Sequence, residues 1–258
     1  MAKRKHEESA SAETGLAAQV MIVTGGSSGL GQHIVSHFAG KGWKVYAVAR
    51  GEEKLKAVCA AAGANAIPVP CNVAEKTQVD ALVTRVLAEQ GRIDVLVQNS
   101  AVGHPGGKFW ELDPKEIDFC IDINLKGVMY LTHSVLKLAM VPKNTGFIFG
   151  IASVAGLHGI PTESCYVASK HGMIGFLDTI ALETRDTGIC VSTICPGGID
   201  TPWWNKDHPY SGTSTHADGT TAHLIQTQEL VDLMDYQLSM PRNRVFKRVV
   251  LFPKNETH

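Results

Sequence analysis

Short apolar runs alternate with longer stretches of helical periodicity along most of the chain. In the stretch Glu75–Gln90, the apolar residues Val79, Leu82 and Val86 recur at the spacing of one helix face. Stretches of similar character cover Lys115–Leu138 and Ser164–Thr187. Seven further runs are bounded by Gly, Pro, Asn or Ser, and most are rich in Val and Ile, which is typical of strands buried on both faces. These runs are Gln19–Thr24, Lys44–Val48, Ala66–Pro70, Ile93–Val97, Gly146–Gly150, Ile189–Cys195 and Arg248–Phe252.

This alternation predicts an α/β fold, a single doubly wound Rossmann domain with about seven parallel strands and helices on both faces. The domain is expected to fill residues 19–258, after a polar N-terminal tail of residues 1–18 that is expected to be flexible. In a sheet of this type, ligands bind at the carboxyl ends of the strands, where the strand order reverses. The residues that follow each strand are therefore the place to search for chemistry.

Composition narrows the possible partners. The 258 residues carry a formal net charge of -1, without the basic footprint of a nucleic-acid-binding protein. No apolar run reaches the roughly 18–20 residues that span a bilayer, so no membrane partner is expected. Six scattered cysteines form no CxxC pair, which favours buried thiols in the cytoplasm. The spacing of His216, Asp218 and His223 suits no standard zinc site, so no metal is expected.

A glycine-rich loop joins the first strand to a helix. It reads Thr24-Gly25-Gly26-Ser27-Ser28-Gly29-Leu30-Gly31. Glycines let the backbone approach a pyrophosphate closely, and the helix that follows offers unpaired N–H groups. The loop lacks the Gly-Lys-Ser/Thr of a P-loop, which argues against an NTPase. Taken alone, the loop also fits a tight turn without a ligand.

The residues after the second strand indicate which dinucleotide would bind. NAD-preferring folds usually place an acidic residue here, whereas this chain has Ala49 and Arg50. The Arg50 guanidinium can pair with a 2′-phosphate, and Ser27 can add a hydroxyl donor. The sequence therefore favours NADP(H) over NAD(H), and a solvated loop charge is the alternative for Arg50.

Two residues with proton-transfer chemistry lie four positions apart. Tyr166 and Lys170 share one face of a predicted helix. A free tyrosine has a pKa near ~10, and a nearby ammonium lowers it, so Tyr166 can exchange a proton with a carbonyl or alcohol oxygen. Ser153 follows the fifth strand and can bond the same oxygen. Asn124 is a polar amide in an apolar helical stretch, which indicates a buried structural bond or a water site.

With these motifs in order, the chain resembles the single-domain short-chain dehydrogenase/reductase family, NADP(H)-preferring type. The resemblance runs from about residue 20 to residue 200 through TGGSSGLG, the Asn of NLKG, Ser153 with YVASK, and PGGIDT, and the layout continues through residues 224–253. It implies that Tyr166 is the general acid/base and that Lys170 lowers its pKa and holds the nicotinamide ribose. It also implies that Ser153 orients the substrate carbonyl and that Asn124 holds a water in a proton relay.

The motifs and the resemblance together give a set of expected cofactor-binding residues, which includes the adenine-side Asn72 and the carboxamide-side Ile199 and Thr201. The full set is Gly25, Ser27, Ser28, Gly29, Leu30, Gly31, Arg50, Asn72, Val73, Asn99, Ala101, Tyr166, Lys170, Pro196, Gly197, Ile199 and Thr201. The chain departs from the family pattern in two places. Gln98-Asn99-Ser100-Ala101 replaces the usual Asn-Asn-Ala-Gly, and Asn72 replaces an Asp.

The interval 201–222 corresponds to the substrate lid of the family. It opens with the adjacent Trp203 and Trp204, which either wall the substrate pocket together with Ser153 and Tyr166 or pack under the lid or at a subunit contact. Apart from Lys206, no basic residue of the lid stands out as a carboxylate clamp. A neutral or moderately apolar ketone is therefore the expected substrate.

The function predicted from the sequence is NADPH-dependent reduction of a carbonyl to a secondary alcohol, or the reverse oxidation. The alternative is a non-catalytic dinucleotide-binding regulatory or scaffold protein, which the presence of both Tyr166 and Lys170 disfavours. The chain is too short for the substrate domain of a nucleotide-sugar epimerase. By family likeness, the two long helices and the last strand are expected to form the faces of a homo-oligomer, a tetramer or a dimer.

Overall fold

Seven parallel strands form one sheet in the computed structural model, which describes residues 19–103, 106–204 and 224–254. The strand order is β3-β2-β1-β4-β5-β6-β7. The predicted sheet is confirmed, because each predicted run forms a strand whose ends differ from the expected ones by two residues or fewer. The strands are β1 (Val20–Thr24), β2 (Lys44–Ala49), β3 (Ala66–Pro70), β4 (Val95–Gln98), β5 (Gly146–Ile151), β6 (Ile189–Pro196) and β7 (Arg248–Leu251).

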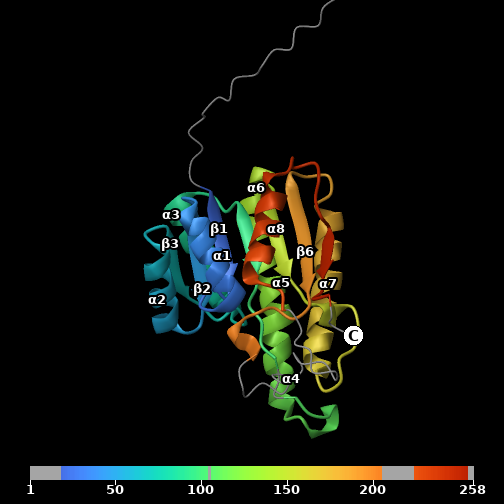
Figure 1. Ribbon diagram of the computed structural model, residues 1–258. Coiled ribbons are helices and arrows are strands. Elements are labelled where there is room, and N and C mark those ends of the chain that lie inside the picture. The colour runs from blue at the N-terminus through green and yellow to red at the C-terminus, as the bar shows by residue number, and fades with distance from the viewer. Residues whose placement is uncertain (1–18, 104–105, 205–223, 255–258) are drawn as a thin grey trace, which may run out of the picture.

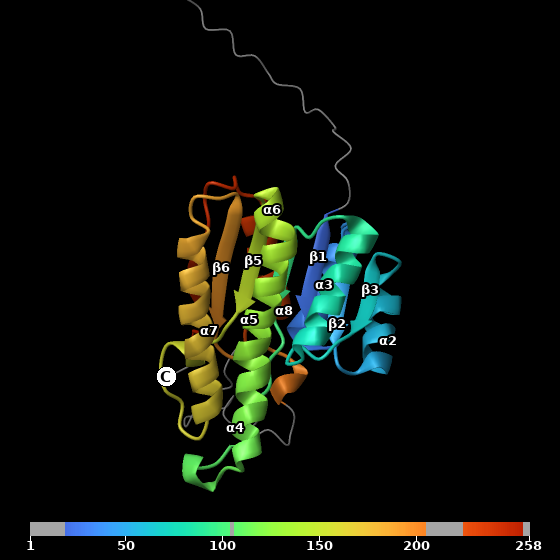
Figure 2. The ribbon, with the colours of Figure 1, turned by 180° about the vertical axis from the view of Figure 1, so that it is seen from behind.

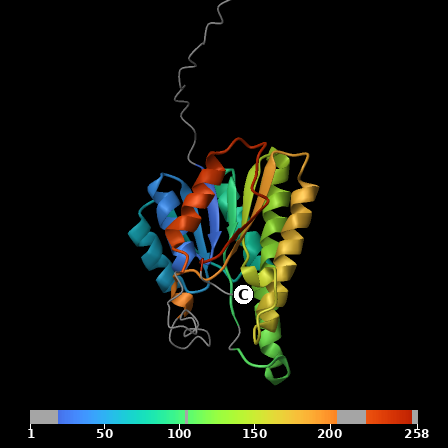
Figure 3. The same cartoon turned by 45° about the vertical axis from the view of Figure 1, so that its right-hand side comes forward.

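Helices cover both faces of the sheet, as the alternating pattern predicts (Figures 1 and 2). Along β1, Ile22 packs into the core on one face and Met21 and Val23 into the core on the other, because successive side chains point to opposite faces. Figure 3 shows the sheet between the two helical layers. One layer contains α1 (Gly29–Gly40), α2 (Glu52–Ala62) and α8 (Thr227–Ser239), and the other contains α3 (Lys76–Gln90), α5 (Gly127–Val135) and α7 (Ser164–Glu183).

The single helix predicted over residues 115–138 is part of a longer helical rod in the structure. It begins with α4 (Pro114–Ile121), where the Asp113 side chain accepts a hydrogen bond from the Lys115 backbone N–H at 3.0 Å. It then continues past Leu138 and contains two π-helical segments that the hydrophobic period did not reveal. The remaining segments are η2 (Asp122–Lys126, π), α5, η3 (Leu136–Met140, π) and α6 (Val141–Lys143). Since π segments are frequent at functional sites, η2, which contains Asn124, is of particular interest.

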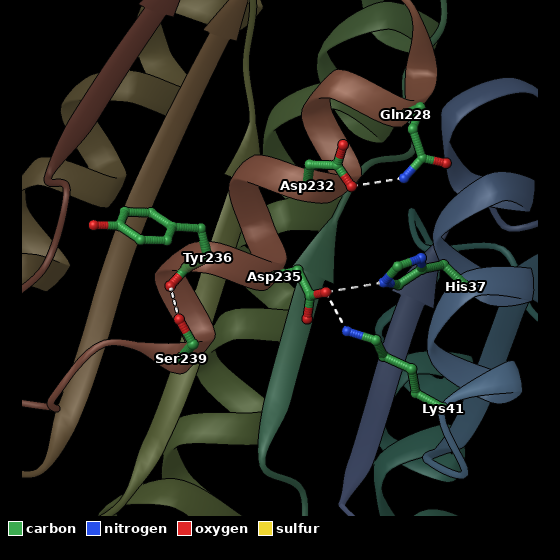
Figure 4. A network of polar contacts seen from close by, with 7 residues as sticks. All are labelled: His37, Lys41, Gln228, Asp232, Asp235, Tyr236 and Ser239. Carbon is green, nitrogen blue, oxygen red and sulfur yellow. Dashed lines mark hydrogen bonds and ion pairs between the residues drawn. The ribbon is translucent and has the colours of Figure 1, made fainter.

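Polar contacts fasten α8 to α1 (Figure 4). Asp235 accepts from Lys41 and lies 3.2 Å from His37 Nε2. Nearer the helix starts, His33 Nδ1 lies 2.7 Å from Thr227 Oγ1. Exposed ion pairs of this kind contribute little to the free energy of unfolding, so these contacts mainly set the orientation of α8 relative to α1. They hold the start of α8 beside α1, the helix that begins at the glycine loop.

The strand order reverses between β1 and β4, and the carboxyl ends of all strands share one edge of the sheet, which points downward in Figure 1, toward α4. The expected N-terminal tail and most of the expected lid lie outside the described residues. Across residues 19–103, 106–204 and 224–254, no helix is long and apolar enough to cross a membrane. All six cysteines are buried and free, as predicted.

Candidate active site

The glycine loop folds tightly against the start of α1. Gly25 and Gly29 adopt φ values of 68° and 52°, a region that other residues enter only with strain. A Cβ atom placed on Gly31 would lie 2.2 Å from the Gly25 carbonyl oxygen. The loop, at the carboxyl edge of the sheet, therefore requires glycine at these positions. Ser28 occupies the N-cap position of α1 without a side-chain capping bond.

Asn99 and Ser100 hold this loop from the end of β4. Asn99 Nδ2 donates to the Thr24 carbonyl at 2.9 Å, and the Asn99 and Ser100 backbone N–H groups donate to Thr24 Oγ1 at 2.9 and 3.0 Å. The neighbouring Gln98 is buried and donates to the Val128 carbonyl and to Thr132 Oγ1. The departure from the family pattern is thus accommodated by hydrogen bonds to α5, and Asn99 supports the glycine loop.

Gly31→Ala should damage this loop selectively. The added methyl group would collide with backbone, which cannot rotate away, so we expect the free energy of unfolding to fall by about 1–3 kcal/mol. Dinucleotide affinity, measured by fluorescence titration, should fall roughly tenfold or more, which corresponds to about 1.4 kcal/mol. Gly40→Ala is the matched control, because nothing lies within 4 Å of a Cβ at the other end of the same helix. Equal binding by both variants would contradict this assignment.

Beside the glycine loop, the ends of β2 and β3 carry the expected adenosine-side residues. Arg50 is exposed at the end of β2. Asn72 Oδ1 accepts from the Ala74 backbone N–H at 3.2 Å, so its oxygen is used within the turn while its NH₂ group is not. Val73 is buried against Gly127, where an added Cβ would meet its side chain at 2.8 Å. These segments lie at the carboxyl edge of the sheet, on the β2–β3 side of β1.

Ser153, Tyr166 and Lys170 come together between the end of β5 and the start of α7. The Ser153 and Tyr166 side chains are hydrogen-bonded to each other. Lys170 is 1% exposed, and its Nζ donates to the Ile151 carbonyl at 2.9 Å and lies 5.6 Å from the centroid of the Tyr166 ring. Sequence reasoning did not single out Ile151, although its place at the end of a strand was a usable signal.

Burial dominates the ionisation of this group. It raises the pKa of Tyr166 above its ordinary value; the Ser153 hydrogen bond opposes this shift and Glu163 reinforces it. Burial also lowers the pKa of Lys170 to about 8. Desolvation of the phenol is the largest cause of the upward shift, and the lowering of the Tyr166 pKa by Lys170 that the family resemblance implies stays a prediction. Burial of the phenol thus favours its neutral form.

Asn124 is fully buried in the π segment η2. Of the two roles that the sequence indicated for its amide, a structural bond or a water site, the structure shows structural hydrogen bonds. Its Oδ1 accepts from the Val102 N–H at 2.8 Å, and its Nδ2 donates to the Val102 carbonyl at 2.8 Å and to Ser169 Oγ at 3.1 Å. The Asn124 Nδ2 atom also lies 3.3 Å from Cys120 Sγ. The amide thus ties the segment after β4 to α7.

The segment after β6 brings Trp203 to Tyr166. The Gly197 backbone N–H donates to the Leu251 carbonyl, which fixes the turn after Pro196. Ile199 and Ile225 form an isolated parallel bridge, so the two ends of the lid interval lie together. Trp203, in the short helix η5 (Pro202–Trp204), has its ring centroid 6.0 Å from that of Tyr166.

Not every expected residue can be placed. The Trp204 side chain lies outside the described residues, as do His216, Asp218 and His223. Within the described part of the chain, no group of three or more His, Cys, Asp or Glu residues could hold a metal ion. Thr201, an expected cofactor contact, packs against Gly29, 3.2 Å from the position of an added Cβ. The glycine loop, the segment after β6 and Tyr166 thus share one edge.

These features define a doubly wound α/β protein with a Ser–Tyr–Lys group and a glycine loop at one sheet edge, and the comparisons identify its family. A model of the short chain dehydrogenases matches residues 19–210. The chain therefore belongs to the short-chain dehydrogenase family of oxidoreductases.

Individual relatives agree with this assignment. The chain is 38% identical over 192 residues to a 3-oxoacyl-(acyl-carrier-protein) reductase of Synechocystis sp., covering 73% of this chain and 77% of the relative. It is 36% identical over 187 residues to a 3beta-hydroxysteroid dehydrogenase of Mediterraneibacter gnavus, covering 71% and 67%. A solved structure of a variant actinorhodin polyketide ketoreductase with NADPH superimposes with a TM-score of 0.81 at 31% identity, covering 91% and 95%.

Proposed function

We propose that this chain reduces a ketone to a secondary alcohol with NADPH, or catalyses the reverse oxidation. The observation that carries the proposal is the Tyr166 hydroxyl, hydrogen-bonded to Ser153 with Lys170 on the next turn, at the same sheet edge as a glycine loop. Relatives named as reductases and dehydrogenases support it. A scaffold protein without catalysis has no need of the buried Lys170 amine, whose desolvation costs stability.

The residues at the sheet edge fit a nicotinamide dinucleotide. The backbone of the glycine loop and the N-terminus of α1 would take the pyrophosphate. Arg50 and Ser27 would take the 2′-phosphate, and Asn72 and Val73 the adenine. The remaining members of the expected set would contact the ribose and carboxamide: Asn99, Ala101, Tyr166, Lys170, Pro196, Gly197, Ile199 and Thr201. The dinucleotide, when bound, supplies or accepts the hydride.

The protein's own residues would transfer the proton to the substrate oxygen. Ser153 and Tyr166 would both hydrogen-bond the substrate oxygen, and Tyr166 would give it a proton as negative charge develops there. Its raised pKa keeps the phenol protonated until negative charge develops on the substrate oxygen. Lys170 would bond the ribose with the donors not used by Ile151, and its pKa of about 8 lets it return a proton to Tyr166 near neutral pH.

Asn124 contributes to the proposed proton relay through its segment rather than through its amide. Its side chain is already bonded to Val102 and Ser169, so it has little capacity for a water. A π segment shifts backbone carbonyls out of the regular α-helical hydrogen-bond pattern, and such a carbonyl in η2 would bind the relay water.

Trp203 beside Tyr166 supports an apolar wall over the substrate, with Trp204 proposed to extend it. The substrate we propose is therefore a neutral or moderately apolar ketone. A panel of such ketones, assayed with NADPH by the loss of its absorbance, tests the function. Tight NADPH binding without turnover of any panel member would favour the scaffold alternative.

Arg50→Asp tests the cofactor preference. A carboxylate at this position would repel a 2′-phosphate and could accept from a ribose hydroxyl instead. We expect the KM for NADPH to rise roughly tenfold or more and its advantage over NADH to shrink or invert, with Lys54→Asp on the exposed first turn of α2 as a charge-matched control. An unchanged ratio of the two kcat/KM values would refute the phosphate role.

Exposed apolar side chains support the proposed homotetramer or dimer. They lie on the elements expected to form subunit faces: Leu138 on the long helical rod, Leu182 on α7 and Val250 on β7. Light scattering of the purified protein would measure the oligomeric state. A cytoplasmic location remains part of the proposal and is consistent with six free, buried thiols.

A further inference from the structure

Arg50 and Phe119 form a contact that joins β2 to α4. The Arg50 guanidinium carbon lies 5.3 Å from the centroid of the Phe119 ring, within the range of a cation–π interaction. Phe119 is 40% exposed, although it is a large apolar side chain. In the sheet, β2 and β4 flank β1, and the chain passes from β4 to α4. The contact therefore connects the two sides of the edge where the glycine loop lies.

The Arg50 guanidinium has its donors available. In the described ranges, it makes no hydrogen bond and no ion pair. The acidic residues that follow it, Glu52 and Glu53, lie 2.7 and 3.6 Å from Lys56 Nζ. A guanidinium that stacks on a ring by its face keeps its N–H edge for an anion, and this edge matches a phosphate bidentately. The ring of Phe119 can thus orient Arg50 without competing for its donors.

The position of Phe119 on its helix agrees with this role. Phe119 lies in the last turn of α4, next to the π segment η2 that contains Ile123. Ile123 is buried in the same core cluster as Val73, the residue expected on the adenine side. The contact with Arg50 directs the Phe119 side chain toward the end of β2.

We propose that Phe119 is a positioning residue for NADP(H) selectivity, which holds the Arg50 guanidinium with its N–H edge toward the 2′-phosphate. This inference rests on the proposed NADPH function and adds a residue from α4 to it. Its expected size is modest, because a cation–π contact at an exposed site supports about a two- to fivefold change in affinity.

The test measures dissociation constants of Phe119→Leu by calorimetry for four ligands: NADPH, NADH, 2′,5′-ADP and 5′-ADP. We expect NADPH and 2′,5′-ADP to bind about two- to fivefold more weakly, NADH and 5′-ADP to be unchanged, and Phe119→Trp to restore binding. Trp110→Leu is the matched control. Trp110 is 77% exposed and has Lys108 Nζ 5.3 Å from its ring centroid, the same kind of contact, so its loss should alter none of the four constants.

A double mutant identifies the route of the effect. In an Arg50→Gln background, Phe119→Leu should cause no further loss, since the ring acts through the guanidinium. Equal losses for NADH and NADPH, persistence of the loss without Arg50, or no loss in Phe119→Leu would each overturn the positioning role while leaving the proposed function intact. A wild-type protein that binds 2′,5′-ADP no better than 5′-ADP would overturn both the cofactor preference and this inference.

Discussion

Replacing Tyr166 with phenylalanine is expected to lower turnover about 10³-fold, within the range of general acid–base contributions. The substitution removes only the hydroxyl, which is hydrogen-bonded to Ser153, and keeps the ring that packs 6.0 Å from Trp203. NADPH affinity and the free energy of unfolding should therefore change little. Absorbance assays of NADPH consumption, fluorescence titration with NADPH and thermal unfolding measure the three quantities.

The control for this substitution is Tyr236→Phe, which removes a hydroxyl from an exposed tyrosine on α8 and should leave turnover unchanged. Activity of Tyr166→Phe close to that of the wild type would mean that another group donates the proton. Loss of NADPH binding in the same variant would instead assign Tyr166 mainly to the binding of the cofactor.

Replacing Lys170 with methionine should lower kcat/KM by about 10²-fold or more, because the proposed ribose contact and the proton source for Tyr166 are lost together. The stability of this variant should remain close to that of the wild type. Methionine fills a similar volume, and the lost hydrogen bond to Ile151 is offset because an ammonium is no longer buried.

The pH dependence of stability gives Lys170→Met a second readout. The folded-state pKa of Lys170, about 8, lies below the ordinary value of ~10.4, so between these values the unfolded chain binds more protons. The wild-type free energy of unfolding should therefore rise with pH from about 8 to about 10 on account of this group, and the rise should be absent in Lys170→Met. The matched control is Lys41→Met at the surface just after α1, which should keep both the activity and the rise. An identical pH profile in Lys170→Met and the wild type would contradict the burial of a titrating amine.

The fold was predictable because each of its elements is encoded locally. Apolar runs of strand length, separated by helical periods, require parallel strands with helices on both faces, and all seven predicted strands formed. The ends of the long rod were less predictable. The helical spacing of apolar residues alone did not distinguish π-helix from α-helix, so η2 and η3 were not predicted.

Motif order likewise predicted that Tyr166, Lys170 and Ser153 would meet. The four-residue spacing fixes the first two on one helix face, and parallel strands deliver Ser153 to the same edge. The ionisation of these groups was not predictable, because it depends on how much solvent the folded protein excludes. The sequence showed an ammonium near a phenol, whereas the tertiary structure buries both and drives the pKa of Tyr166 upward.

Sequence alone therefore determined the class of fold and the residues available for chemistry at the sheet edge, which follow from local periodicity and spacing, and the order of its motifs carried the resemblance to the family. Only the tertiary structure decided which distant residues touch. The Ile151 carbonyl accepts a hydrogen bond from Lys170, the Val102 carbonyl accepts one from the Asn124 amide, and the Phe119 ring lies beside the Arg50 guanidinium. Such contacts depend on how helices and strands pack across the sheet, and no local pattern records the distance between side chains that lie far apart along the chain.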